Sequence, residues 1–181
     1  MLPILAIAAW SGTGKTTLLK KLIPLLKQRG VRPGLIKHTH HNMDVDTPGK
    51  DSYELRKAGA DQVLVASKQR WALMMETPDE QDPDFSWLVS QMDARTLDIV
   101  LVEGFKDEPI PRILLWRRQS GQHHTDADWE TLLDERVIAV ASDESLDITL
   151  TVPLLDLNNP QQIAAFIIQW LNHINGSSID I

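Results

Sequence analysis

The chain has 181 residues, of which 43% are hydrophobic and 24% are charged, and these fractions exclude a disordered or a fibrous chain. The length is close to that of one ordinary domain and is sufficient to bury a core. The formal net charge of -7 argues against a general nucleic-acid binder, which needs a basic surface.

Strand and helix patterns alternate along the chain. An apolar run over residues 3–10 ends at glycines, which is typical of a strand buried on both faces of a parallel sheet. The other expected elements are a helix that ends near Gly30, a strand over 34–38, a polar loop over 39–51, a helix over 52–58, a hairpin over 62–66 and 71–76, a helix over 85–92, strands over 98–102, 113–116 and 137–141, a helix around 129–133, and a helix that begins at Pro160.

This alternation predicts an α/β fold with a mostly parallel sheet, helices on both faces and an added β-hairpin. We expect a single domain over residues 1–175 and a flexible tail over residues 176–181. Pro24 should kink the first helix, because proline removes a helical hydrogen bond. Asn159 should cap the last helix, with Pro160 at its first position.

Two absences limit the function classes further. The chain has no cysteine, which excludes disulfides, thiolate metal sites and cysteine nucleophiles. No apolar run approaches the roughly 18 residues that a membrane-spanning helix needs, and the first ten residues lack a basic leader. We therefore expect a cytoplasmic protein that contacts neither membrane nor nucleic acid.

The segment AAWSGTGKTT, which joins the first strand to the first helix, has the composition of a phosphate-binding loop (P-loop). Gly12 and Gly14 allow positive φ and bring consecutive backbone amides together around an anion. Lys15 can reach the outer phosphates of a nucleotide, and Thr16 offers a hydroxyl to Mg²⁺. Ala9 stands where many such loops have glycine. The sequence thus predicts a single P-loop NTPase domain.

A second acid is needed to hold the waters of the metal ion, and LDIVLVEGF supplies one. Glu103 follows an apolar strand and precedes Gly104, whose amide could approach the terminal phosphate. In the polar loop KHTHHNMDVDTPGKDS, Asp44 and Asp46 could join Mg²⁺ through water, and Lys50 could neutralise developing charge.

The same loop leaves a metal-binding alternative open. His38, His40 and His41 could bind zinc or nickel, because alternate residues of a strand point to one face. No second motif with metal-ligand spacing supports such a site, and His123 and His124 form a separate pair in another polar stretch.

Guanine preference is not visible in its usual place, since the Asn-Lys-x-Asp signature of many GTPases is absent. Asp143, at the end of the strand in VIAVASDE, is a candidate substitute, because a carboxylate can accept hydrogen bonds from N1 and the exocyclic amine of guanine. An ordinary strand-end aspartate would look the same.

Four stretches together resemble the molybdopterin-guanine dinucleotide biosynthesis protein B (MobB) family of P-loop NTPases: WSGTGKTT, GLIKHTHH, DVDTPGKDSYELRKAGA and LVEGFK. The resemblance covers the first two-thirds of the chain strongly. It implies a cytoplasmic GTP-binding homodimer with weak GTPase activity that assists the molybdopterin guanylyltransferase, which joins GMP to molybdopterin. By position, it places the phosphates and Mg²⁺ at Gly12, Thr13, Gly14, Lys15, Thr16 and Thr17, and Asp44, Asp46 and Glu103 around the metal.

We expect slow hydrolysis, because no arginine or glutamine adjoins the P-loop motif to stabilise the transition state. Two rival functions use the same motif: a small-molecule kinase, for which Arg112, Arg117 and Arg118 are the nearest lid residues, and a nickel or zinc delivery GTPase that uses the histidines. Molybdopterin itself is a further candidate ligand, with Arg112, Lys106 and residues 38–41 as its possible anion contacts.

Overall fold

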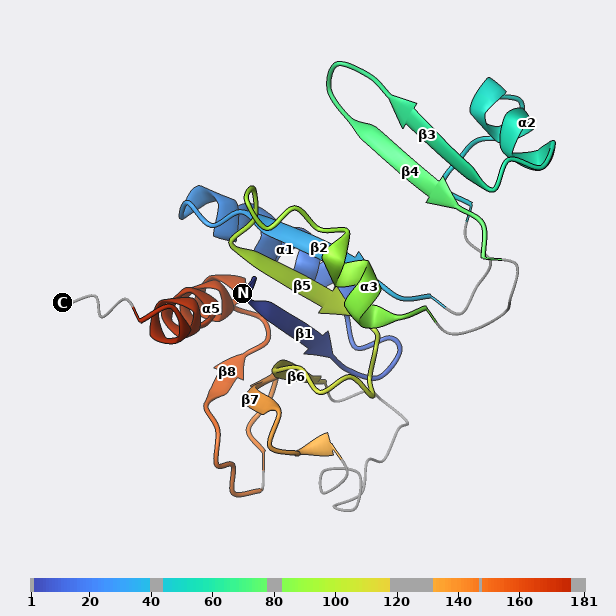
Figure 1. The fold of residues 1–181 in the computed structure, drawn as a ribbon. Helices are drawn as coiled ribbons and strands as arrows, with labels where there is room; N and C mark the ends of the chain where they lie inside the picture. The colour runs from blue at the N-terminus through green and yellow to red at the C-terminus, as the bar shows by residue number, and fades with distance from the viewer. Residues whose placement is uncertain (1, 40–43, 78–82, 118–131, 147, 177–181) are drawn as a thin grey trace. The chain divides into compact units, whose positions relative to one another are not determined.

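The computed structural model describes residues 2–39, 44–77, 83–117, 132–146 and 148–176 (Figure 1). The chain forms two compact units. Unit 1 contains Met1–His38 and Phe85–Ile181, and unit 2 is the segment Thr39–Asp84 between them.

Unit 1 is built on a six-stranded sheet in the order β2-β5-β1-β6-β7-β8, and all of its neighbouring strands pair in parallel. The strands are β1 (Ile4–Ala8), β2 (Pro33–Lys37), β5 (Ile99–Glu103), β6 (Arg112–Trp116), β7 (Val137–Ser142) and β8 (Leu154–Asp156). The predicted parallel α/β fold is therefore confirmed. The three residues of β8 were too few to give a periodic signal, so the sequence did not predict this edge strand.

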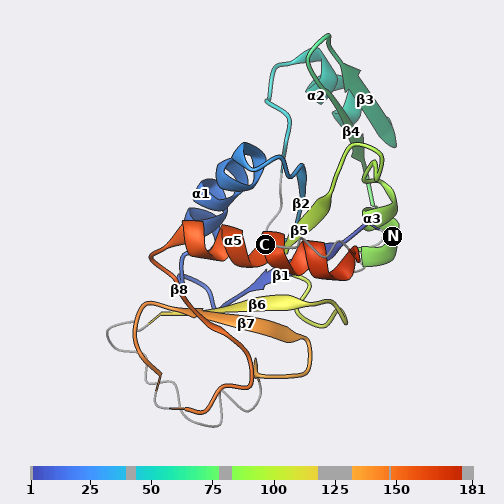
Figure 2. The same cartoon turned by 90° about the vertical axis from the view of Figure 1, so that its left-hand side faces the viewer.

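The helices of unit 1 cover both faces of this sheet (Figure 2). Among the described residues these helices are α1 (Lys15–Gln28), α3 (Phe85–Ser90) and α5 (Pro160–Ile174). Leu22 of α1 and Ile167 of α5 pack with the strand side chains of one face and are fully buried. Phe85 of α3 packs on the opposite face with Val100 and Val102. Burial of each such side chain contributes roughly 1.5–3 kcal/mol.

The helix ends follow the expected chemistry. Asn159 caps α5, because its side-chain oxygen accepts a hydrogen bond from the Gln162 amide at 3.2 Å, and Pro160 begins the helix. Pro24 lies inside α1, which continues to Gln28; the kink expected there stays a prediction. The helix expected around residues 129–133 falls mostly outside the described residues, as do His123, His124 and residues 177–181.

Unit 2 contains the predicted short helix and hairpin. They are α2 (Asp51–Lys57), β3 (Gln62–Ala66) and β4 (Trp71–Met75), with β3 and β4 antiparallel. The Ser67 side chain closes the turn, because its hydroxyl accepts from the Arg70 amide and donates to the Arg70 carbonyl.

In the part of the chain that the structure describes, we find no helix suited to crossing a membrane.

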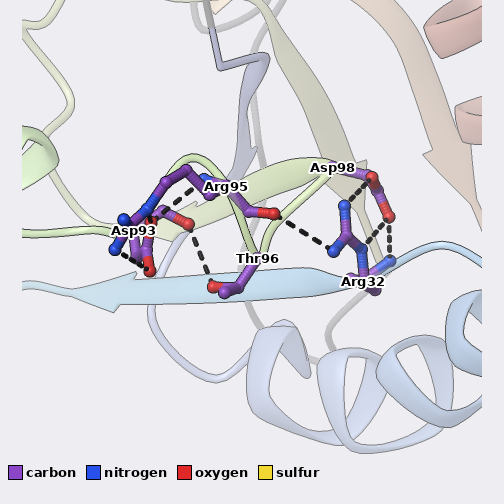
Figure 3. A network of polar contacts seen from close by, with 5 residues as sticks. All are labelled: Arg32, Asp93, Arg95, Thr96 and Asp98. Carbon is purple, nitrogen blue, oxygen red and sulfur yellow. Dashed lines mark hydrogen bonds and ion pairs between the residues drawn. The ribbon is translucent and has the colours of Figure 1, made fainter.

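A network of polar contacts joins the amino ends of β2 and β5 (Figure 3). The Arg32 guanidinium donates to both carboxylate oxygens of Asp98, at 3.0 and 2.8 Å, and its backbone amide donates to the same carboxylate at 2.7 Å. These hydrogen bonds with Arg32 hold the pKa of Asp98 below its ordinary value of 3.8. Asp98 directly precedes β5, at the end of the strand opposite Glu103.

Arg32→Gln should lower the urea midpoint of unfolding slightly at neutral pH, because Asp98 loses its bidentate partner. The pKa of Asp98 is depressed in the folded state, so the stabilisation is present above pH 3.8 and is lost as pH falls through the folded-state value. The gap between wild type and Arg32→Gln should thus close below pH 3.8. Arg95→Gln, which removes a more exposed pair with Asp93 two residues away, is the control and should lower the midpoint less than Arg32→Gln does. A gap that stays constant down to pH 2 would contradict this account.

Candidate functional site

The predicted P-loop and Glu103 lie at one edge of unit 1. In a parallel sheet the carboxyl ends of all strands lie at the same edge, and ligands of open α/β sheets bind there. The register pairs Ile7 of β1 with Glu103 of β5, and Trp116 of β6 with Ser142 of β7. The segments that follow β1, β5, β6 and β7 are therefore neighbours.

The loop after β1 has the backbone of an anion-binding turn. Gly12 and Gly14 have φ of 81° and 102°, values that side-chain-bearing residues rarely adopt. Gly14 is the N-cap of α1 and provides no side-chain hydrogen bond to the helix. The first amides of a helix have no acceptor within it, so those of α1 are available to an anion.

Lys15 bends back over this loop. Its ammonium group donates to the carbonyls of Ala9 and Trp10, both at 2.9 Å. Burial lowers the pKa of Lys15, the carboxylate of Glu103 opposes this change, and the positive charges of Lys106 and Lys37 lower the pKa further. An ammonium has three donors, so one remains for an incoming phosphate oxygen.

The threonines of the motif have different surroundings. Thr13 is 3% exposed and belongs to the buried side of the loop, whereas Thr16 and Thr17 are exposed in the first turn of α1. Thr16 therefore keeps an accessible hydroxyl at the mouth of the loop.

Glu103, the last residue of β5, is held by a lysine. Its side chain is 12% exposed, and both carboxylate oxygens lie 3.3 Å from the ammonium nitrogen of Lys37, the residue opposite it on β2. A hydroxyl and a carboxylate are hard oxygen ligands of the kind that Mg²⁺ prefers. The donor set of Thr16 and Glu103 thus fits a magnesium ion.

The turn after Glu103 is tightly packed. Gly104 has φ of 100°, and a Cβ added there would lie 2.6 Å from the Cβ of His38. Phe105 also has positive φ, 53°, and its ring stacks on that of His38 with centroids 4.7 Å apart. His38 thus packs against the turn that carries the candidate metal acid.

Asp44 and Asp46 belong to unit 2. Asp44 forms an ion pair with Arg56, which also pairs with Glu76 at 2.8 Å. One carboxylate oxygen of Asp46 accepts hydrogen bonds from the Thr47 amide and the Ser52 hydroxyl, whereas the other is buried and has no hydrogen-bond partner among the described residues. The meeting of either aspartate with Glu103 at a metal ion stays a prediction.

Arg117 corrects one premise drawn from the sequence. No arginine adjoins the P-loop motif along the chain, yet the Arg117 guanidinium donates to the carbonyl of Thr13 at 3.3 Å. The parallel pairing of β6 with β1 brings it there. Arg117 also donates to Asp143 and Asn158. The expectation of slow hydrolysis can therefore not depend on the absence of an arginine.

Asp143 follows β7 and lines a shallow hollow of about 470 Å³. Its side chain is 18% exposed, and Asn158 and Gln162 also line the hollow. This position suits a residue that contacts the base of a nucleotide whose phosphates lie in the neighbouring P-loop.

Other candidate residues have different roles or lie outside the described residues. Arg112 donates to the carbonyls of Lys106 and Glu108, both at 3.0 Å, and so holds the connection between β5 and β6. His40, His41 and Arg118 lie outside the described residues. Within the described ranges, no group of three metal-ligating side chains comes together.

Comparison with known proteins now identifies the family. Residues 4–143 match the family described as molybdopterin guanine dinucleotide synthesis protein B. The chain belongs to this MobB family. The match includes the P-loop, Glu103 and Asp143.

Relatives and solved structures of the MobB family match over nearly the whole chain. The molybdopterin-guanine dinucleotide biosynthesis adapter protein of Escherichia coli (strain K12) is 61% identical over 176 residues, 97% of both chains. The protein of that name from Haemophilus influenzae is 48% identical over 176 residues, which are 97% of this chain and 93% of that protein. A crystal structure of molybdopterin-guanine biosynthesis protein B superposes with a TM-score of 0.72 at 27% identity, over 93% of this chain and 99% of that chain.

Gly104→Ala should destabilise this MobB-family chain by about 3 kcal/mol, because the methyl group adds overpacking against His38 to the strain of positive φ. Gly30→Ala is the matched control, since Gly30 has φ of 82° but no atom within 4 Å of an added Cβ. It should lose only about 1 kcal/mol. Urea unfolding of both variants measures the difference, and equal losses would show that the contact with His38 contributes nothing.

Proposed function

We propose that this protein binds Mg²⁺-GTP at the carboxyl edge of the unit 1 sheet, hydrolyses it slowly, and acts as an adapter in the formation of molybdopterin guanine dinucleotide. The observation that carries the nucleotide-binding part is the P-loop, in which two glycines at positive φ, the first amides of α1 and the Lys15 ammonium converge. The adapter part is supported by the names of relatives that match 97% of the chain.

Each part of the site has a distinct role in this proposal. The loop amides from Gly12 to Thr17 bind the phosphates, and the remaining donor of the Lys15 ammonium binds a phosphate oxygen. Thr16 and Glu103, both in unit 1, hold Mg²⁺, which neutralises charge on the outer phosphates. The roles at the metal that the sequence assigns to Asp44 and Asp46 stay predictions. Asp143 accepts hydrogen bonds from the guanine edge.

The proposed slow hydrolysis is explained by the contacts of Arg117 rather than by the absence of an arginine. The Arg117 guanidinium has three oxygen acceptors in unit 1, so it is not held ready for the transferring phosphate. A partner would then complete the catalytic site, as expected for an adapter that works with a guanylyltransferase. Molybdopterin would be a further ligand of that complex. Turnover of GTP by the purified protein at the roughly 1–100 per second of kinases would contradict this proposal.

Lys15→Ala should weaken GTP and ATP together by about 10- to 100-fold, because a hydrogen bond to a charged group contributes about 1.5–3 kcal/mol. Isothermal titration with both nucleotides and Mg²⁺ measures this loss and also the base preference of the wild type. Lys27→Ala, at the exposed far end of α1, is the control and should bind as wild type does. Unchanged binding by Lys15→Ala would exclude the P-loop as the nucleotide site.

We also propose that the protein is a homodimer that pairs through the hairpin. Pairing of β3 with β4 places Leu64, Trp71, Leu73 and Met75 on one face, and these side chains are 43% to 67% exposed. A contiguous exposed apolar face is typical of a protein interface. A second copy of the chain would bury it against the same face of its own hairpin.

Leu73→Glu should convert the dimer to a monomer, because a charge would be buried in the interface. Light scattering after size-exclusion chromatography measures the mass. Val65→Glu is the matched control: Val65 is as exposed as Leu73, at 43%, but it alternates to the other face of the hairpin. A wild-type monomer, or a dimer that survives Leu73→Glu, would contradict the proposal.

A further inference from the structure

Arg117 connects three segments at the carboxyl edge of unit 1. Its Nε donates to the Thr13 carbonyl at 3.3 Å, one terminal nitrogen to the Asp143 carboxylate at 3.2 Å, and the other to the Asn158 side-chain oxygen at 3.4 Å. These acceptors belong to the P-loop, to the turn after β7 and to the turn after β8. The single side chain thus uses all three of its nitrogens on separate elements.

The rigid guanidinium of Arg117 fixes the separation between the residues that accept its hydrogen bonds. The group is planar and rigid, so its donors keep fixed mutual distances, unlike the ammonium of lysine. Thr13 is 3% exposed, so this acceptor is itself held in place within the loop. Asp143 is thereby held at a set distance and orientation from the P-loop.

Stability alone is a weak reason for such an arrangement. The Arg117 and Asp143 side chains are 38% and 18% exposed, and an ion pair that stays in contact with water stabilises a fold only modestly. Asp143 also lines the hollow of about 470 Å³ at the ends of β7 and β8. A carboxylate that must meet a base there gains from being held in place before the base arrives.

We propose that Arg117 is a positioning residue for base recognition: it sets the Asp143 carboxylate at the distance from the P-loop that lets it accept from N1 and the 2-amino group of guanine. This inference rests on the proposed binding of GTP. Adenine has an unprotonated N1 and no 2-amino group, so the same carboxylate faces a lone pair and disfavours it. Arg117 has donors only and cannot itself accept from the guanine edge.

The test compares ligands that share the phosphates and differ in the base. The full chain with Mg²⁺ is titrated with GTP, ATP, XTP and inorganic tripolyphosphate, as wild type, Arg117→Gln, Asp143→Asn and the double variant. Arg117→Gln should weaken GTP about tenfold, or about 1.4 kcal/mol, with ATP and tripolyphosphate changed less than about twofold. Asp143→Asn should weaken GTP and strengthen XTP, whose 2-oxo group accepts from the new amide.

Coupling between the two residues distinguishes positioning from general support. The double variant should bind GTP no more weakly than Asp143→Asn, because Arg117 acts through Asp143. Arg117→Lys, which retains the charge but not the planar guanidinium, should also lose the preference for GTP. This variant replaces Arg117→Gln in the titrations if Arg117→Gln folds poorly. Arg95→Gln removes an exposed arginine that is paired with Asp93 and should change nothing.

Two results would overturn the inference while leaving GTP binding intact. Equal weakening of GTP, ATP and tripolyphosphate by Arg117→Gln would mean that Arg117 acts on the P-loop alone. Additive losses in the double variant would mean that it acts independently of Asp143. Absence of GTP binding by the wild type would instead refute the proposed function, and this inference with it.

Discussion

The position of β1 between β5 and β6, in parallel with both, is the constraint on which the site depends. Parallel pairing brings the carboxyl ends of the three strands to one edge, where the chain must leave each strand through a turn. The turn after β1 contains the P-loop, the turn after β5 begins with Glu103, and β6 is followed by Arg117. A reversed strand at any of these places would move its polar group to the opposite edge.

The charges at this edge differ from those of the whole molecule. The chain has a formal net charge of -7, yet Lys15 is close enough to Lys37 and Lys106 for both to lower its pKa. The carboxylate of Glu103, which also pairs with Lys37, opposes this effect by raising the pKa of Lys15. A concentrated positive site on an acidic protein is suited to a small polyanion rather than to a long nucleic acid.

Unit 2 contributes a different kind of surface. Its α2 has no buried residue, and one face of its hairpin is apolar and exposed. Its polar chemistry is concentrated before and within α2, where the ion pair of Asp44 with Arg56 and the hydrogen bonds of Asp46 order the backbone. The buried oxygen of Asp46 without a partner is the feature of this unit that best suits a metal ligand.

Local chemistry was readable from the sequence by itself. Positive φ at Gly12 and Gly14, the cap at Asn159 and the apolar strand before Glu103 follow from residue types and short spacings, as does the parallel α/β class. The role of Arg117 was not readable, because Thr13 lies 104 residues away and β6 must first pair with β1. Strand order and register are long-range choices made by packing the whole sheet, and so only the tertiary structure decided which charged side chains share the edge.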